Sequence, residues 1–82
     1  MPRTKLSARS DAEKDLVRLI RAQSYAVFGS VNSAAPRCGM TRQTFAKRMG
    51  RVEKLTLGEL RTIREQTRIS KEELLPILER FL

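Results

Sequence analysis

Residues 40–49 read MTRQTFAKRM, and the helix that this stretch predicts is the element around which the rest of the fold can be arranged. Thr41 is a common helix cap, so it predicts a helix that begins at the next residue and ends near Met49. Gly50 is expected to supply a left-handed residue at the helix end. Phe45 and Met49 are one turn apart and are expected to face a core. The long polar side chains at the helix start then point outward, and they need an explanation.

Capping boxes mark three further helix starts, because each pairs a Ser or Thr with a Glu three residues later. These boxes begin at Ser10, Thr56 and Ser70. The first is expected to begin a helix with one apolar stripe that ends at Gly29. In the last helix, Pro76 is expected to introduce a kink.

A short second helix is expected before Thr41, and its start has two possible placements. A cap at Ser33 puts Pro36 in the first turn, where its missing N–H costs no hydrogen bond. A cap at Ser30, with a kink at Pro36, is the competing placement. In both cases Gly39 can adopt the positive φ of a turn. No stretch alternates as a strand does, so the predicted fold class is all-α with five helices.

The net charge of +8 is concentrated in two segments. Residues 1–10 hold three bases and no acid, and residues 37–54 hold six bases against one acid, a net +5. Residues 11–36 and 55–82 are each balanced. Within the first helix, the bases Lys14, Arg18 and Arg21 are expected to face water. Such clustering is typical of a protein that binds a polyanion.

The residue types argue against several classes of protein. A chain of 82 residues is expected to form one domain, here a basic tail over 1–9 followed by a folded part over 10–82. A single cysteine, Cys38, and no His leave no zinc site and no intramolecular disulfide, and Cys38 is expected in the core. No apolar run is long enough to cross a bilayer. We therefore expect a cytoplasmic protein that is not an enzyme and needs no cofactor or small-molecule ligand.

Over about residues 16–78 the sequence resembles the phage Cro and lambda-repressor-like helix-turn-helix family. The resemblance rests on Ala35, Gly39-Met40-Thr41, Thr44-Phe45, Arg48, EKLTLGELRTI at 53–63 and ISKEELL at 69–75. Ala34 and Pro36 depart from the family's pattern. The resemblance implies a five-helix lambda-repressor-like domain that binds double-stranded DNA. It also implies a homodimeric transcriptional repressor or regulator of phage or mobile-element type, associated with the nucleoid of a bacterial host cell.

The expected recognition helix explains the polar start of the quoted segment. Arg42 can donate two hydrogen bonds to guanine, and Gln43 can pair with adenine in the same way. The residues expected to read bases are Thr41, Arg42, Gln43, Ala46 and Lys47. Those expected to contact phosphates are Asn32, Ser33, Arg48, Arg51, Lys54, Arg3 and Lys5, although Arg48 could instead pack along the fourth helix.

The apolar C-terminal helix predicts a two-fold dimer contact, and simple core packing is the alternative. The residues concerned are Leu74, Ile77, Leu78, Phe81 and Leu82. Two other functions stay open. One is a protein-interaction module, such as an inhibitor or antirepressor, that uses the same fold. The other is nonspecific coating of nucleic acid, which predicts equal affinity for any duplex and a steep loss with salt.

Overall fold

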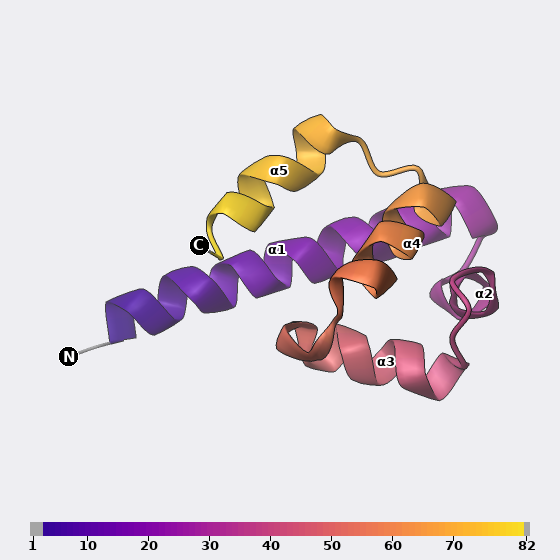
Figure 1. The fold of residues 1–82 in the computed structure, drawn as a ribbon, viewed down its shortest axis with the longest axis horizontal. Helices are drawn as coiled ribbons and strands as arrows, with labels where there is room; N and C mark the ends of the chain where they lie inside the picture. Colours follow the sequence, from indigo (N-terminus) through magenta and orange to yellow (C-terminus); the bar gives the residue numbers. More distant parts are fainter. Residues whose placement is uncertain (1–2, 82) are drawn as a thin grey trace.

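Five α-helices and one short 3-10 helix make up the part of the chain that the structure describes (Figure 1). The computed structural model describes residues 3–81, with side chains from residue 11 onward. The elements are α1 (Arg3–Phe28), α2 (Val31–Arg37), α3 (Arg42–Gly50), η1 (Val52–Lys54), α4 (Leu57–Thr67) and α5 (Lys71–Glu79). No strand occurs within residues 3–81. The all-α, five-helix prediction is therefore confirmed for this range.

Hydroxyl side chains begin four of the helices. Thr41 Oγ1 accepts the backbone N–H of Thr44 at 3.1 Å, as predicted for the start of α3. Thr56 forms the complete capping box with Glu59, in which each residue accepts a backbone N–H of the other. Ser70 Oγ accepts the N–H of Glu73 at 3.2 Å and starts α5. Because these bonds are local in sequence, the capping pattern predicted them correctly.

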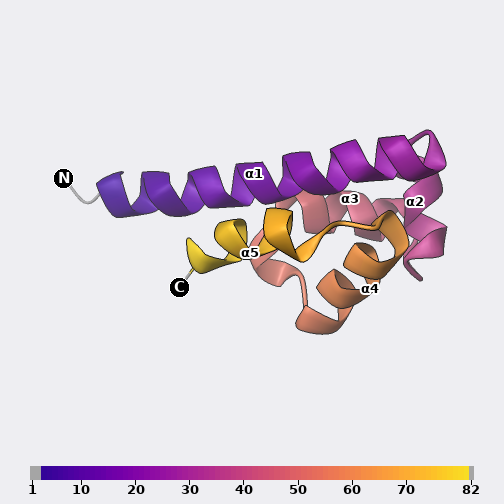
Figure 2. The ribbon, with the colours of Figure 1, turned by 90° about the horizontal axis from the view of Figure 1, so that it is seen from above.

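The first helix begins earlier than predicted, because α1 starts at Arg3 and Ser10 lies inside it. Figures 1 and 2 show the N-terminal end of α1 extending past the other helices. Residues 3–9 contain neither Gly nor Pro, and Leu, Ala, Lys and Arg favour helix, so nothing stops the helix at the predicted cap. The expected tail is thus helical from Arg3 onward. Its proposed DNA contacts through Arg3 and Lys5 lie outside the described side chains.

The second helix uses the competing placement. Ser30 has an extended backbone and its hydroxyl accepts the N–H of Ser33 at 3.1 Å, so the predicted cap at Ser33 is wrong. This earlier start places Val31 in the helix, where it packs against the core. Pro36 then lies inside α2, and the carbonyl of Asn32 four residues before it has no N–H to accept there.

Two glycines have the left-handed backbone that a turn needs, and a third expected one does not. Gly29 ends α1 at φ 82° and Gly39 forms the α2–α3 turn at φ 74°, as predicted. Gly50 has no positive φ and is the last residue of α3, so that prediction is wrong. Arg51 follows with φ −139°, because the chain leaves α3 in an extended direction and enters η1. A left-handed residue does end α4, at Arg68 with φ 58°.

The core lies on one side of α1. Figure 2 shows α2 to α5 gathered along that side. The cluster of buried side chains that joins them includes Leu16, Ile20, Ala34, Ala35, Cys38, Phe45, Met49, Ile63 and Ile69. The prediction that Cys38 and Phe45 face the core is therefore confirmed, and Met40 packs partly buried against it. No helix within the described residues is long and apolar enough to span a membrane.

The C-terminal helix contributes to the same core. Leu74 is only 5% exposed, so almost none of its surface is available to the predicted dimer contact. Ile77, Leu78 and Phe81 are partly buried against the core, which agrees with the alternative of core packing. Arg80 also binds Asp15 of α1 at 2.7 Å and fixes the end of α5. The remaining predicted dimer residue, Leu82, lies outside the described residues.

Candidate nucleic-acid interface

Helix α3 has one buried face and one exposed face. Phe45 is 1% exposed and Met49 is 5% exposed, and both belong to the core. The residues of the exposed edge are Thr41, Arg42, Gln43, Ala46 and Lys47. All five residues expected to read bases are thus brought together on one outward edge, supported from behind by buried side chains. Their role in binding stays a prediction.

The start of α3 is held by hydrogen bonds that occupy Thr41. Its hydroxyl oxygen accepts the backbone N–H of Thr44, and its hydroxyl hydrogen is donated to Thr44 Oγ1 at 2.9 Å. Both hydrogen-bonding functions serve the first turn. Thr41 therefore positions the helix, while Arg42 and Gln43 beside it are exposed and have no such local bond.

Arg48 was expected to contact phosphate, and the structure instead pairs it with α4. Its Nε donates to Glu59 Oε1 at 3.1 Å, and its side chain is 30% exposed. The same Oε1 accepts the Thr56 N–H at 2.9 Å. These bonds, first from Thr56 and then from Arg48, hold the pKa of Glu59 below its ordinary value. Arg48 thus links the end of α3 to the start of α4, as the alternative interpretation had it.

The end of α3 and the chain that follows it carry three basic residues, Lys47, Arg51 and Lys54, which we call the basic turn. These three exposed side chains line one shallow groove together with Gly50 and Arg48. No carboxylate lines this groove. The basic turn borders the exposed edge of α3 directly, because Lys47 belongs to α3 and Arg51 follows its last residue.

On its other side, α3 borders a groove formed with α1 and α2, which we call the α2–α3 groove. Asn32 and Arg42 line it, above a floor that includes Phe45 and Ala46. Asn32 is exposed, as a phosphate contact requires. Ser33 is exposed too, but its N–H and hydroxyl both bond to Ser30, at 3.1 and 2.8 Å. The Ser33 N–H is therefore occupied, whereas its hydroxyl only accepts the Ser30 O–H and can still donate its own hydrogen to a phosphate.

Arg21 also lines the α2–α3 groove, and sequence reasoning missed it. It was expected to face open water with Lys14 and Arg18. A signal was present in the spacing, because Val17 and Phe28 are four residues before and seven after Arg21 and so share its face. Both are partly buried against the core. Arg21 therefore lies on the border of the buried face.

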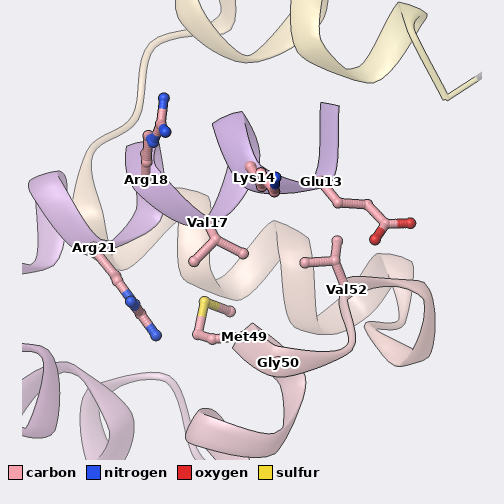
Figure 3. Close-up of a pocket in the computed structure, with 8 residues that line it drawn as sticks. All are labelled: Glu13, Lys14, Val17, Arg18, Arg21, Met49, Gly50 and Val52. Carbon is pink, nitrogen blue, oxygen red and sulfur yellow. The ribbon is translucent and has the colours of Figure 1, made fainter. Parts of the chain in front are cut away.

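Figure 3 shows the adjoining groove between α1 and the end of α3, with Val17 and Met49 at its centre. In this view Arg21 points from α1 toward α2 and α3, whereas Arg18 points the opposite way. Arg18 also pairs with Asp15, at 3.7 Å. The two arginines, less than one helical turn apart, thus have different surroundings.

The described residues were expected to hold neither a metal ion nor a reactive cysteine. No group of three or more His, Cys, Asp or Glu side chains there could hold a metal ion. Cys38 is buried, and burial raises the pKa of its thiol, which disfavours the reactive thiolate. Comparisons of the chain with protein-family models, with curated proteins and with solved structures find no match.

Proposed function

We propose that this protein binds double-stranded DNA sequence-specifically and acts as a transcriptional repressor or regulator of phage or mobile-element type. In this proposal α2 and α3 form a lambda-repressor-like helix-turn-helix, and α3 is the recognition helix. One observation carries it: the outer edge of α3 is polar and exposed while Phe45 and Met49 bury its other face. A major groove admits one such helix.

Within the proposal the exposed residues of α3 have separate roles. Arg42 donates two parallel hydrogen bonds to guanine O6 and N7, and Gln43 pairs with adenine N6 and N7. Ala46 allows close approach and can contact a thymine methyl group. Arg51 and Lys54 of the basic turn bind phosphates and fix the register without reading sequence, while Lys47 lies where it can contact a base edge or a phosphate. Occupancy of a promoter by this domain would block transcription without any further chemistry.

The proposal is tested by selecting bound fragments from random duplex DNA at near-physiological salt. We expect enrichment of a short motif. The double variant Arg42→Ala with Gln43→Ala should lose the preference for that motif, with each lost bidentate pair costing about 1–3 kcal/mol of discrimination. A matched control is Arg61→Ala with Gln66→Ala, which removes the same residue types from the exposed face of α4. This control should keep the preference.

Two rival functions give different results in the same experiment. A protein-interaction module would enrich no motif. Nonspecific coating would bind every duplex with similar affinity and with a log-log salt slope near −5 for about six neutralised phosphates. The proposal fails if the wild-type protein shows no preference among duplexes, or if the α3 double variant keeps the wild-type preference.

The proposal includes a homodimer, which would place two recognition helices about 34 Å apart on an inverted repeat. Because Leu74 is buried, the contact would have to use the exposed part of the C-terminal region. Leu57 is 85% exposed and lines an apolar groove with Leu60, Leu78 and Phe81. This groove contains two of the predicted dimer residues, which supports assigning the contact to it.

Sedimentation of the Leu57→Gln variant tests the dimer. Loss of one buried leucine from each protomer should raise the dissociation constant of the dimer by at least about tenfold. Leu75→Gln is the control, because Leu75 is 52% exposed on α5 but does not line the groove. A wild-type protein that stays monomeric at all concentrations, with and without DNA, rejects this part of the proposal.

A further inference from the structure

Arg21 borders α3 on the side away from the basic turn. It lines the α2–α3 groove with Asn32 and Arg42, and it also lines the groove around Met49. In Figure 3 its side chain points from α1 toward α2 and α3. The spacing from Val17 and Phe28 indicates only that Arg21 borders the buried face of α1, and its position beside α3 is a consequence of how α1 packs.

The α2–α3 groove collects positive charge without a matching acid. Arg21 and Arg42 both line it, and no carboxylate does. Arg21 is exposed and makes no hydrogen bond or ion pair with a described residue. Two like charges beside one groove repel each other, and an anion bound between them offsets that repulsion. The amide of Asn32 adds a neutral hydrogen-bond donor to the same groove.

The exposed arc of α3 has two edges. Arg42 and Lys47 are five residues apart, which is roughly 140° around a helix with 3.6 residues per turn. Arg42 therefore lies at the edge next to Arg21, and Lys47 lies at the edge next to Arg51 and Lys54, the other two residues of the basic turn. A helix about 10–12 Å wide fills a major groove about 12 Å wide, so phosphates of both strands come close to both edges.

We propose that Arg21, with Asn32, binds a backbone phosphate of the DNA strand that flanks α3 on the α2 side. The basic turn holds the opposite strand, so that α3 lies between two phosphate contacts. This inference rests on the proposed DNA binding. It adds to the interface a residue from a segment of the sequence that carries no net charge.

The Arg21→Ala variant should weaken binding to the selected site and to an unrelated duplex by the same factor, and leave the ratio between them unchanged. Loss of one phosphate contact makes the plot of log affinity against log salt concentration less steep, by about 0.9 in slope. The affinity ratio of wild type to variant should therefore be about 3.5-fold larger at 50 mM than at 200 mM salt. Arg21→Lys keeps the charge and should keep a slope near that of the wild type.

Arg18→Ala is the matched control, because Arg18 lies on the same helix, is exposed, and pairs with Asp15. It should bind like the wild type. Circular dichroism and thermal melting check that each variant is folded. The contacted phosphate can be located by single methylphosphonate substitutions, which remove one charge each. The substitution at that phosphate should weaken the wild type and have no further effect on Arg21→Ala.

The possible outcomes separate the two proposals. If the wild type binds no duplex, DNA binding itself is rejected, and the role of Arg21 with it. If the wild type binds but Arg21→Ala behaves like Arg18→Ala, only the Arg21 contact is rejected. A change of preferred sequence in Arg21→Ala, without a change of salt slope, also rejects the phosphate role.

Discussion

Glu59 links the end of α3 to the start of α4, and replacing it should lower the free energy of unfolding more than replacing an ordinary surface glutamate. Its Oε1 accepts the Thr56 N–H at 2.9 Å and the Arg48 Nε–H at 3.1 Å. Glu59→Ala removes the capping bond, worth about 1 kcal/mol, and a carboxylate at a helix N-terminus, worth about 0.5 kcal/mol. The Arg48 pair adds about 0.5 kcal/mol. We expect a loss of about 2 kcal/mol, or roughly 8–16 °C in Tm for a domain of this size.

Urea unfolding of Glu59→Ala and Glu65→Ala measures the difference. Glu65 lies on the same helix and accepts from Arg61 Nε at the same 3.1 Å, but its side chain is 53% exposed, against 24% for Glu59. It caps nothing, so Glu65→Ala should cost less than about 0.5 kcal/mol. Equal shifts of the urea midpoint in the two variants would show that the link between α3 and α4 contributes nothing.

The charge of Glu59 can be separated from its hydrogen bond with Glu59→Gln, because the amide oxygen can still accept from Thr56. The folded-state pKa of Glu59 is lowered, so its charge stabilises the fold fully above the unfolded-state pKa. That contribution is lost as the pH falls through the folded-state pKa. The wild type should therefore exceed Glu59→Gln in free energy of unfolding at pH 7, and the difference should shrink toward zero in acid. A difference that does not change with pH refutes the assignment.

Three further predictions concern single positions. Gly39→Ala should destabilise the fold by about 1–2 kcal/mol, because the φ of residue 39 is 74°. Gly50→Ala should stabilise α3 by up to about 1 kcal/mol, because Gly50 has an ordinary φ and open space around it. Urea unfolding of the two variants compares these effects. Ile63→Ala removes a side chain with 0% exposure and should cost about 2–5 kcal/mol, measured as a fall in Tm. Cys38, 6% exposed with a raised thiol pKa, should react with a thiol reagent at neutral pH only at the rate of unfolding, and fast reaction of folded protein contradicts its burial.

Local chemistry explains which helix starts could be predicted. The caps at Thr41, Thr56 and Ser70 were predictable because each bond joins residues three apart. The cap at Ser10 carried the same signal and failed, because residues 3–9 can continue the helix and nothing in a capping box prevents it. Ser30 and Ser33 were both suitable caps. The cap at Ser30 places Val31 in the helix, where it packs against the core. The capping pattern alone could not predict this tertiary contact.

Those residues of the candidate interface that lie on α3 itself could be predicted from the sequence. The exposed edge of α3 follows from the spacing of Phe45 and Met49, so its residues were correctly expected to face outward. The roles of Arg48 and Arg21 depend on other helices. Arg48 meets a carboxylate eleven residues away, and Arg21 reaches α3 only because α1 packs beside it. Such contacts need the tertiary structure.

The net charge of residues 37–54 therefore overstates how many basic side chains are available for the proposed DNA contact. Arg48 is paired with Glu59, and the Arg37 guanidinium lies 5.9 Å from the centre of the Phe28 ring. The cation–π contact gives Arg37, the last residue of α2, an interaction within the fold. Arg51, in the basic turn, borders α3 instead. The matched pair Arg37→Gln and Arg51→Gln removes the same charge from the same basic segment.

Only the second of these changes should alter the salt dependence of DNA binding. Arg51→Gln should make the log-log slope less steep by about 0.9, as expected for one lost phosphate contact. Arg37→Gln should leave the slope unchanged. Titrations of both variants at several salt concentrations measure this directly. If the two slopes fall equally, the protein binds DNA through its overall positive charge, and the orientation of α3 in the groove would not matter. Unequal slopes require a docking geometry that uses Arg51 and not Arg37, because the two substitutions remove the same charge from different places on the surface.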